Sequence, residues 1–329
     1  MKYLGMVLSV AVSGAMVSES SQAALAEHGF DGELSVLAGY SSQESNFNTD
    51  NAVKNGELNS RGESDSSIVV FPLGQLRYTF GQGAKSQLFL GTAREDVITG
   101  LVALEAGYKR EVGPNSSIAL SYLPTVVNDE TWEDPFVLNA ARKETDASGN
   151  AVRLQYDNIL GSQLNLDLAW FEQEVDKERS GAALAADDMD ALRRDGDGWY
   201  SRLSYRLPVG QGAILAPALR YQVFDADGDA MSYTRWQADA TYVRFIGRHR
   251  YSLSAEYSNY DFDASHPVFN RTREDDQWGL TMGYEYADIF GWQDWAFTGI
   301  ISFSERDSNI NFYDETERFI VSAGVTYHF

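Results

Sequence analysis

Residues 319–329, at the end of the chain, read FIVSAGVTYHF. Every second position is apolar, and these positions are Phe319, Val321, Ala323, Val325, Tyr327 and Phe329. The positions between them are mostly small or polar, namely Ser322, Gly324, Thr326 and His328, and only Ile320 breaks the alternation. Successive side chains of a β-strand point to opposite faces. This stretch therefore predicts a strand that is apolar on one face and polar on the other.

The same period of two runs back through the chain to Gly32. The segments that show it are 32–42, 73–81, 86–92, 101–112, 116–124, 150–158, 163–175, 198–207, 213–225, 232–244, 251–262, 275–286, 294–304 and 316–329, which makes fourteen predicted strands. An even number of antiparallel strands is what a closed bacterial barrel needs. Twelve or sixteen strands also fit, because segment 86–92 is the weakest and a long loop could hide a hairpin.

The connections between these segments alternate in length. The short ones are 81–85, 113–115, 160–162, 208–212, 245–250 and 287–293, and the long polar ones include 43–71, 125–149 and 176–197. Aromatic residues such as Tyr40 and Trp236 lie near strand ends on the apolar face, as rings do at bilayer interfaces. The predicted fold is therefore all-β, a closed antiparallel transmembrane β-barrel with short periplasmic turns and long extracellular loops. The alternative is a large soluble β protein with ordinary core packing.

The start of the chain predicts export. Lys2 is followed by an apolar run over 3–17 and then by small residues that offer cleavage after Ala23 or Ala26. The run is too short and too interrupted for a membrane-spanning anchor helix, which needs about 20 apolar residues. We therefore expect a signal peptide over 1–23 and a single barrel domain over 24–329. No later stretch is apolar for long enough to form a transmembrane helix.

Composition excludes several classes of function. The chain has no cysteine, which removes disulfides, cysteine metal sites and thiol nucleophiles. Its formal net charge is -22, which argues against nucleic acid as a partner because a phosphate backbone needs cationic neutralisation.

The end of the chain also supports a resemblance. A last strand of alternating apolar residues that ends on Tyr327 and Phe329 resembles the signal read by the barrel-assembly machinery of Gram-negative outer membranes. The last hairpin, with Phe312-Tyr313-Asp314, is similar to the barrel ends of surface-lipoprotein assembly modifiers and exopolysaccharide-export barrels, but their helical periplasmic repeats are missing here. The whole chain resembles uncharacterised outer-membrane proteins of marine gammaproteobacteria. The resemblance implies an outer-membrane location in a Gram-negative bacterium, with membrane lipid, lipopolysaccharide and the assembly machinery as partners.

If the apolar face meets lipid, the polar face lines a lumen. The charged residues predicted to line it are Glu105, Lys109, Arg153, Arg202, Arg206, Arg220, Asp239, Glu256 and Glu285. Cationic residues of the earlier strands and carboxylates of the later ones could face each other across a pore, as in selectivity filters. Alternatively, the same groups could form ion pairs that fill a closed interior. Small inward residues such as Ser252, Gly279 and Ser322 favour an open lumen.

No catalytic, cofactor or metal site is predicted. The four histidines, His28, His249, His266 and His328, face no convincing partner, and His266 is predicted to be a solvated loop residue. The acidic run 225–229 resembles a calcium loop, but Trp236 stands where the twelfth-position Glu of an EF-hand belongs. Loose divalent-ion binding and plain solvated loops both remain compatible with such acidic segments. The segment 180–194 has a helix-forming composition and could form a lid.

We therefore expect a monomeric channel for passive passage of small solutes or ions, not an enzyme. Two alternatives stay open: a plugged structural or surface-binding barrel, and an export barrel for a polymer or lipoprotein that works with a separate periplasmic partner.

Overall fold

A computed structural model describes residues 25, 27–92, 104–125 and 129–329 of the chain. The predicted signal peptide and both predicted cleavage sites lie outside the described residues, as does the start of the predicted strand 101–112. Within the described ranges, no helix has the length and apolar character needed to cross a membrane.

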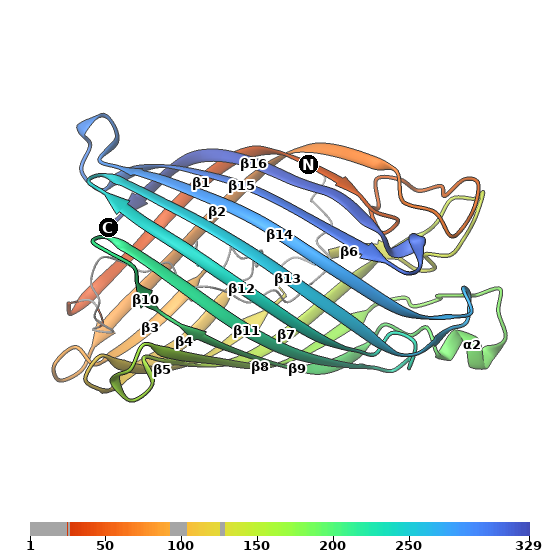
Figure 1. Cartoon of the computed structure of the whole chain (residues 1–329), viewed down its shortest axis with the longest axis horizontal. Coiled ribbons are helices and arrows are strands. Elements are labelled where there is room, and N and C mark those ends of the chain that lie inside the picture. Colours follow the sequence, from red (N-terminus) through yellow and green to blue (C-terminus); the bar gives the residue numbers. More distant parts are fainter. Residues whose placement is uncertain (1–24, 26, 93–103, 126–128) are drawn as a thin grey trace.

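The described chain forms one closed antiparallel barrel of fourteen long strands (Figure 1). They are β1 (Gly29–Glu44), β2 (Ser64–Phe80), β3 (Ser86–Gly91), β4 (Glu105–Gly113), β5 (Ser116–Pro124), β7 (Glu144–Asp157), β8 (Leu164–Val175), β9 (Gly196–Tyr205), β11 (Ala213–Ala226), β12 (Tyr233–Ile246), β13 (His249–His266), β14 (Arg271–Ala287), β15 (Trp295–Ser308) and β16 (Glu315–His328). Two short strands, β6 (Asp129–Trp132) and β10 (Leu207–Pro208), only extend the pairing of β7 and β11. The predicted fold class and strand number are confirmed.

The barrel closes where the last strand pairs with the first. The register of β16 and β1 runs from His328 opposite Glu33 to Thr316 opposite Glu44. Beyond it, the Gly32 amide donates to the Phe329 carbonyl at 2.9 Å, and the Phe329 amide donates to the Gly32 carbonyl at 3.1 Å. Closure removes both free sheet edges, whose unpaired amides could not be satisfied in lipid.

Side chains divide between the two faces as the alternation predicts. Outward apolar residues are exposed, for example Ile68 at 85% and Trp236 at 56%. On β16, Phe319, Val325 and Tyr327 are exposed on the outer face, whereas Ser322 and Thr326 are buried on the inner face. The barrel therefore presents an apolar exterior and a polar interior.

The two ends of the barrel differ, as Figure 1 shows. One end carries short turns, and the other carries the long loops together with the one-turn helix α2 (Ala186–Asp190). Two of the short turns share a geometry, with the short 3-10 segments η1 (Ile159–Gly161) and η2 (Ile289–Gly291). Each turn reverses on left-handed residues and ends on a glycine, Gly161 with φ 79° and Gly291 with φ 78°, a conformation that glycine adopts without strain.

Gly324 is predicted to be essential at the closing seam. A Cβ there would lie 1.9 Å from the Val36 carbonyl oxygen on β1, so one of the two strands would have to shift. We expect Gly324→Ala to lower the free energy of unfolding by about 1–3 kcal/mol, measured by urea unfolding in lipid vesicles. Gly299→Ala is the control, because its nearest neighbours would be 3.7 Å away. Equal stability of the two variants would contradict this account of the seam.

Candidate functional site in the lumen

The predicted lumen residues lie on the inner face of the barrel, and each is buried or partly buried. Glu105, Arg153, Arg202 and Arg220 are each at most 6% exposed, and Lys109, Arg206, Asp239, Glu256 and Glu285 are partly buried. That these side chains line the path of a solute stays a prediction.

A buried ion cluster joins β4, β7 and β8. Arg153 Nη2 donates to Asp167 Oδ2 at 2.7 Å, and its Nη1 lies 3.6 Å from Glu105 Oε2. Glu105 also accepts a hydrogen bond from the Ser121 hydroxyl. Buried charges are tolerated when they are paired and hydrogen-bonded in this way. The two carboxylates of this cluster neutralise the charge of Arg153 within the barrel wall.

The proposed opposition of charges across a pore is wrong for Arg202 and Asp239. Arg202 Nη2 donates to Asp239 Oδ1 at 2.7 Å, and the two residues come from β9 and β12, on either side of β11. They are therefore near neighbours on one wall. The register of β9, β11 and β12 brings the two residues close together. The long Arg202 side chain then reaches across the intervening strand β11.

Two more of the predicted residues, Lys109 and Glu285, have partners near the short-turn end. Lys109 Nζ donates to Asp157 Oδ2 at 2.8 Å. Arg250 Nη1 lies 3.7 Å from Glu285 Oε1, in a directly opposed pair of β13 and β14. Sequence reasoning placed these residues on the correct face but could not assign their partners.

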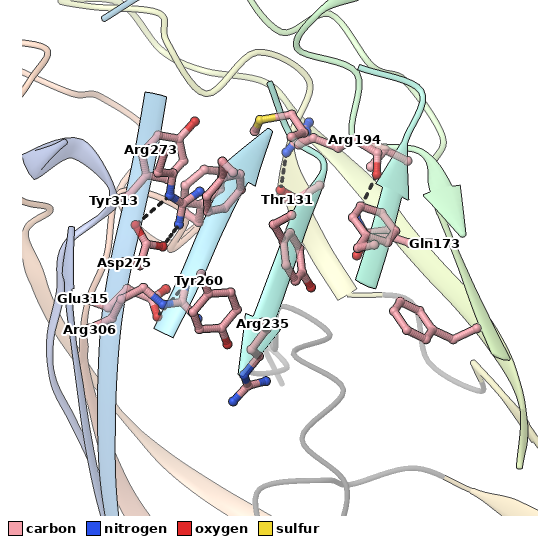
Figure 2. Close-up of a pocket in the computed structure, with 18 of the residues that line it drawn as sticks. Thr131, Gln173, Arg194, Arg235, Tyr260, Arg273, Asp275, Arg306, Tyr313 and Glu315 are labelled. Carbon is pink, nitrogen blue, oxygen red and sulfur yellow. Dashed lines mark hydrogen bonds and ion pairs between the residues drawn. The ribbon is translucent and has the colours of Figure 1, made fainter. Parts of the chain in front are cut away.

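A cavity of about 1280 Å³, counting the part that opens to solvent, lies in the lumen towards the long loops (Figure 2). Its aromatic lining residues are Phe47, Phe171, Phe224, Tyr233, Tyr260, Phe262 and Tyr313. Its charged lining residues are Arg194, Arg235, Arg273, Arg306, Glu130, Asp275 and Glu315. None of these residues was among the predicted site residues, although those of the long strands stand at inward positions of the alternation.

Arginines and aromatic rings stack on each other in this cavity. The Arg273 guanidinium lies 3.6 Å from the ring centre of Tyr313 and 4.4 Å from that of Phe262. Tyr260 lies between two cations, with Arg235 at 4.7 Å and Arg306 at 5.3 Å from its ring. Such cation–π contacts hold both partners in fixed orientations.

Three of the four cavity arginines have carboxylate partners. Arg194 pairs with Glu178 at 2.7 Å, Arg273 forms a bidentate pair with Asp275, and Arg306 lies 3.7 Å from Glu315. Arg235 differs. Its hydrogen bonds within the described part of the chain use Nη2, which donates to the Gln237 and Ser258 side chains.

The long loops pack together over the cavity and form a loop cap, which we define as Phe47, Phe136, Phe269, Phe312 and Tyr313. The rings of Phe47, Phe136 and Phe269 lie 5.9, 5.3 and 5.5 Å from that of Phe312, which is fully buried. These residues come from loops far apart in the sequence. The cap is therefore a small apolar core outside the barrel wall.

Hydrogen bonds tie the loops beside the cap. The Trp132 indole donates to the Asn46 carbonyl at 3.0 Å, and Arg142 Nη1 donates to the same oxygen at 2.6 Å. Arg142 also stacks on Trp132 at 4.2 Å. Burial lowers the pKa of Arg142 to about 10, but it stays charged at neutral pH. The segment 180–194 joins this assembly, since Leu192 is fully buried and Arg194 Nη2 donates to the Trp132 carbonyl.

The prediction that His266 is a solvated loop residue is wrong. Its side chain is fully buried, and its Nε2 lies 2.8 Å from the Tyr313 hydroxyl. The rings of Phe136 and Phe269 lie 5.2 and 4.8 Å from it. Phe269 of the same turn, together with Phe136 and Tyr313 of two other loops, excludes water from a position that the sequence predicts to be exposed. No group of three or more His, Asp or Glu side chains is placed to hold a metal ion within the described ranges.

The barrel is closed and antiparallel, with an apolar exterior, a polar interior and unequal ends. These features place the chain in the class of bacterial outer-membrane β-barrels. The chain belongs to the family described as protein of unknown function (DUF2860), whose profile matches residues 29–328. A comparison with curated proteins found no significant match.

Three solved structures illustrate the likeness of the fold. The outer membrane channel DcaP of Acinetobacter baumannii has a TM-score of 0.46 at 10% identity, over 91% of this chain and 96% of that one. A loop-deletion mutant of OmpT, an outer membrane protein of Vibrio cholerae, has a TM-score of 0.44 at 9% identity, over 92% and 100%. The Pseudomonas putida toluene transporter TodX has a TM-score of 0.42 at 12% identity, over 96% and 94%.

The ion cluster around Arg153 predicts a large loss of stability when its cation is removed. Arg153→Met leaves Glu105 and Asp167 buried with like charge, which lowers the free energy of unfolding by about 3–5 kcal/mol. Urea unfolding in lipid vesicles measures the effect. Arg248→Met, which removes an exposed pair with Asp288, is the control and costs at most about 1 kcal/mol. Adding Glu105→Gln and Asp167→Asn to Arg153→Met restores part of the stability; no recovery would contradict the electrostatic explanation.

Proposed function

We propose that this protein is a porin-like channel in the outer membrane of a Gram-negative bacterium, through which small solutes or ions pass passively. The observation that carries the proposal is the inner face of the barrel, which is polar and charged along its length and opens into a cavity at the loop end. Charged walls of this kind hold water and select ions or solutes. Small side chains at inward positions such as Ser252 and Ser322 favour an open lumen.

Planar-bilayer conductance of the refolded protein, residues 24–329, tests the proposal. We expect stable ohmic steps, and reversal potentials in a salt gradient then give the ion selectivity. Silence from a sample whose fold is confirmed by circular dichroism and by a heat-dependent gel shift would contradict the channel.

The loop cap favours a second candidate, a closed barrel that binds a partner at the surface. Phe312 is fully buried among aromatic rings of other loops, and the hydrogen bonds of Trp132 and Arg142 hold those loops together. A rigid cover of this kind would restrict or block the mouth of the lumen.

Phe312→Ala separates the two candidates. Removing the ring creates a hole in the loop cap and loosens the loops, at a cost of about 3–5 kcal/mol for a fully buried Phe. If the barrel is a channel, the unmodified protein conducts and the variant gives larger or noisier steps. If the barrel is closed, the unmodified protein is silent and only the variant conducts.

Phe290→Ala is the matched control for Phe312→Ala. Phe290 is 82% exposed in a short turn at the opposite end of the barrel, so its removal should leave the conductance unchanged. Equal effects of the two substitutions would show that the loop cap does not control the mouth.

A further inference from the structure

Two arginines on adjacent strands share one neutral partner deep in the lumen. Arg220 on β11 and Arg235 on β12 are 2% and 1% exposed. Arg220 Nη1 lies 3.2 Å from Gln237 Oε1, and Arg235 Nη2 lies 2.5 Å from the same oxygen. A single amide oxygen therefore accepts hydrogen bonds from two guanidinium groups.

Neither guanidinium has a carboxylate partner among the described residues. No Asp or Glu oxygen of these residues lies within the 4.0 Å that defines an ion pair of Arg220 or Arg235. The nearby Asp239 is bound to Arg202, and Glu256 instead accepts a hydrogen bond from Gln237 Nε2 at 3.1 Å. The pair of arginines therefore carries two positive charges with only neutral hydrogen-bond partners.

Polar atoms at this position are left without partners. Arg220 Nε, Arg235 Nε and Gln222 Oε1 are all buried and form no hydrogen bond with the described residues. Buried charges and donors in this state are costly unless an anion or water satisfies them. The register adds electrostatic repulsion, because Arg220 stands directly opposite another cation, Arg202 on β9. The wall is thus arranged to attract an anion.

The arginine pair adjoins the aromatic part of the cavity. Arg235 lies at the inner end of the cavity and points away from the loops, as Figure 2 shows. Its guanidinium stacks on Tyr260, and that of Arg220 lies 5.3 Å from the ring of Tyr200. Phe171 and Phe224 stack on each other nearby, with ring centres 5.9 Å apart. A molecule held at the arginines would have aromatic rings beside it on the loop side.

We propose that Arg220 and Arg235 bind the carboxylate of a small aromatic or similarly flat organic acid, whose ring lies against the aromatic lining of the cavity. This inference rests on the proposed channel function, because it names the class of solute that enters. Guanidinium groups bind carboxylates through charge-assisted hydrogen bonds, and Arg220 Nε and Arg235 Nε are buried donors without a partner among the described residues. Aromatic walls add contact area for a flat apolar group.

Isothermal titration calorimetry tests the site with the refolded barrel in detergent micelles at low chloride concentration. Sodium benzoate is the probe. The comparison compounds are acetate, which lacks the ring, and benzamide, which lacks the charge. The heat of titration into empty micelles is subtracted. We expect benzoate to bind more tightly than either comparison compound. Arg220→Gln and Arg235→Gln should each weaken benzoate binding about tenfold, as the loss of one charge-assisted hydrogen bond predicts.

Arg248→Gln is the control, because it removes the same charge from an exposed residue in a short turn. It should change benzoate affinity less than twofold. Unchanged affinity in both the Arg220 and Arg235 variants would overturn the site, and equal affinity for benzoate and acetate would overturn the role assigned to the aromatic lining.

Single-channel recording separates this inference from the proposed function. A barrel that conducts but does not bind benzoate would refute the organic-acid site and keep the channel. A barrel that binds benzoate at the arginines but never conducts would refute the channel and keep the site. Benzoate that both binds and reduces the conductance of the unmodified protein, but not of Arg235→Gln, supports the two together.

Discussion

The closed ladder of backbone hydrogen bonds is the constraint on which the rest of this structure depends. In hydrocarbon no water is available to satisfy an unpaired amide or carbonyl, and each such group costs several kcal/mol. The pairing of β16 with β1, extended by the mutual hydrogen bonds of Gly32 and Phe329, leaves neither edge of the sheet open. Because the backbone is satisfied in this way, the side chains alone decide what each face of the barrel can contact.

Because the outer face of the barrel contacts hydrocarbon, the charged side chains of the strands lie in the interior or at the two ends. Inside, they compete for a limited number of partners. Arg153 finds carboxylates on β4 and β8, and Arg202 finds one on β12, so their charges are neutralised within the wall. Arg220 and Arg235 find only neutral hydrogen-bond partners, Gln237 for both and Ser258 for Arg235. The acidic net charge of -22 therefore says little about the interior, where the unbalanced charges of the described wall include two cations.

The faces of the strands could be predicted because a period of two is a local property of the sequence. The alternation in 319–329 and in the earlier segments was enough to place Arg153, Arg220 and Asp239 on the inner face. Their partners could not be predicted, because these depend on the register between strands. Arg202 reaches Asp239 across β11, and nothing local in the sequence aligns those two residues.

The loop cap also lay beyond sequence reasoning. Its members are apolar residues that stand singly or in pairs in polar loops, with no periodicity to mark them, and the same polar surroundings predict a solvated His266. The one available signal was composition, since Phe47, Phe136 and Phe312 are large apolar residues in segments that otherwise favour water. Their mutual contacts appear only when the barrel brings loops from distant parts of the chain to the same end.

Thiol labelling tests most directly whether lipid surrounds the barrel and water fills it. The chain has no cysteine, so single cysteines can be introduced at inward Ser254 and Ser302 and at outward Leu253 and Ile301. In lipid vesicles, a water-soluble maleimide is expected to react with Ser254→Cys and Ser302→Cys and to spare Leu253→Cys and Ile301→Cys. Protection of both inward positions, or equal labelling of both faces, would contradict a hydrated lumen inside a lipid-facing wall.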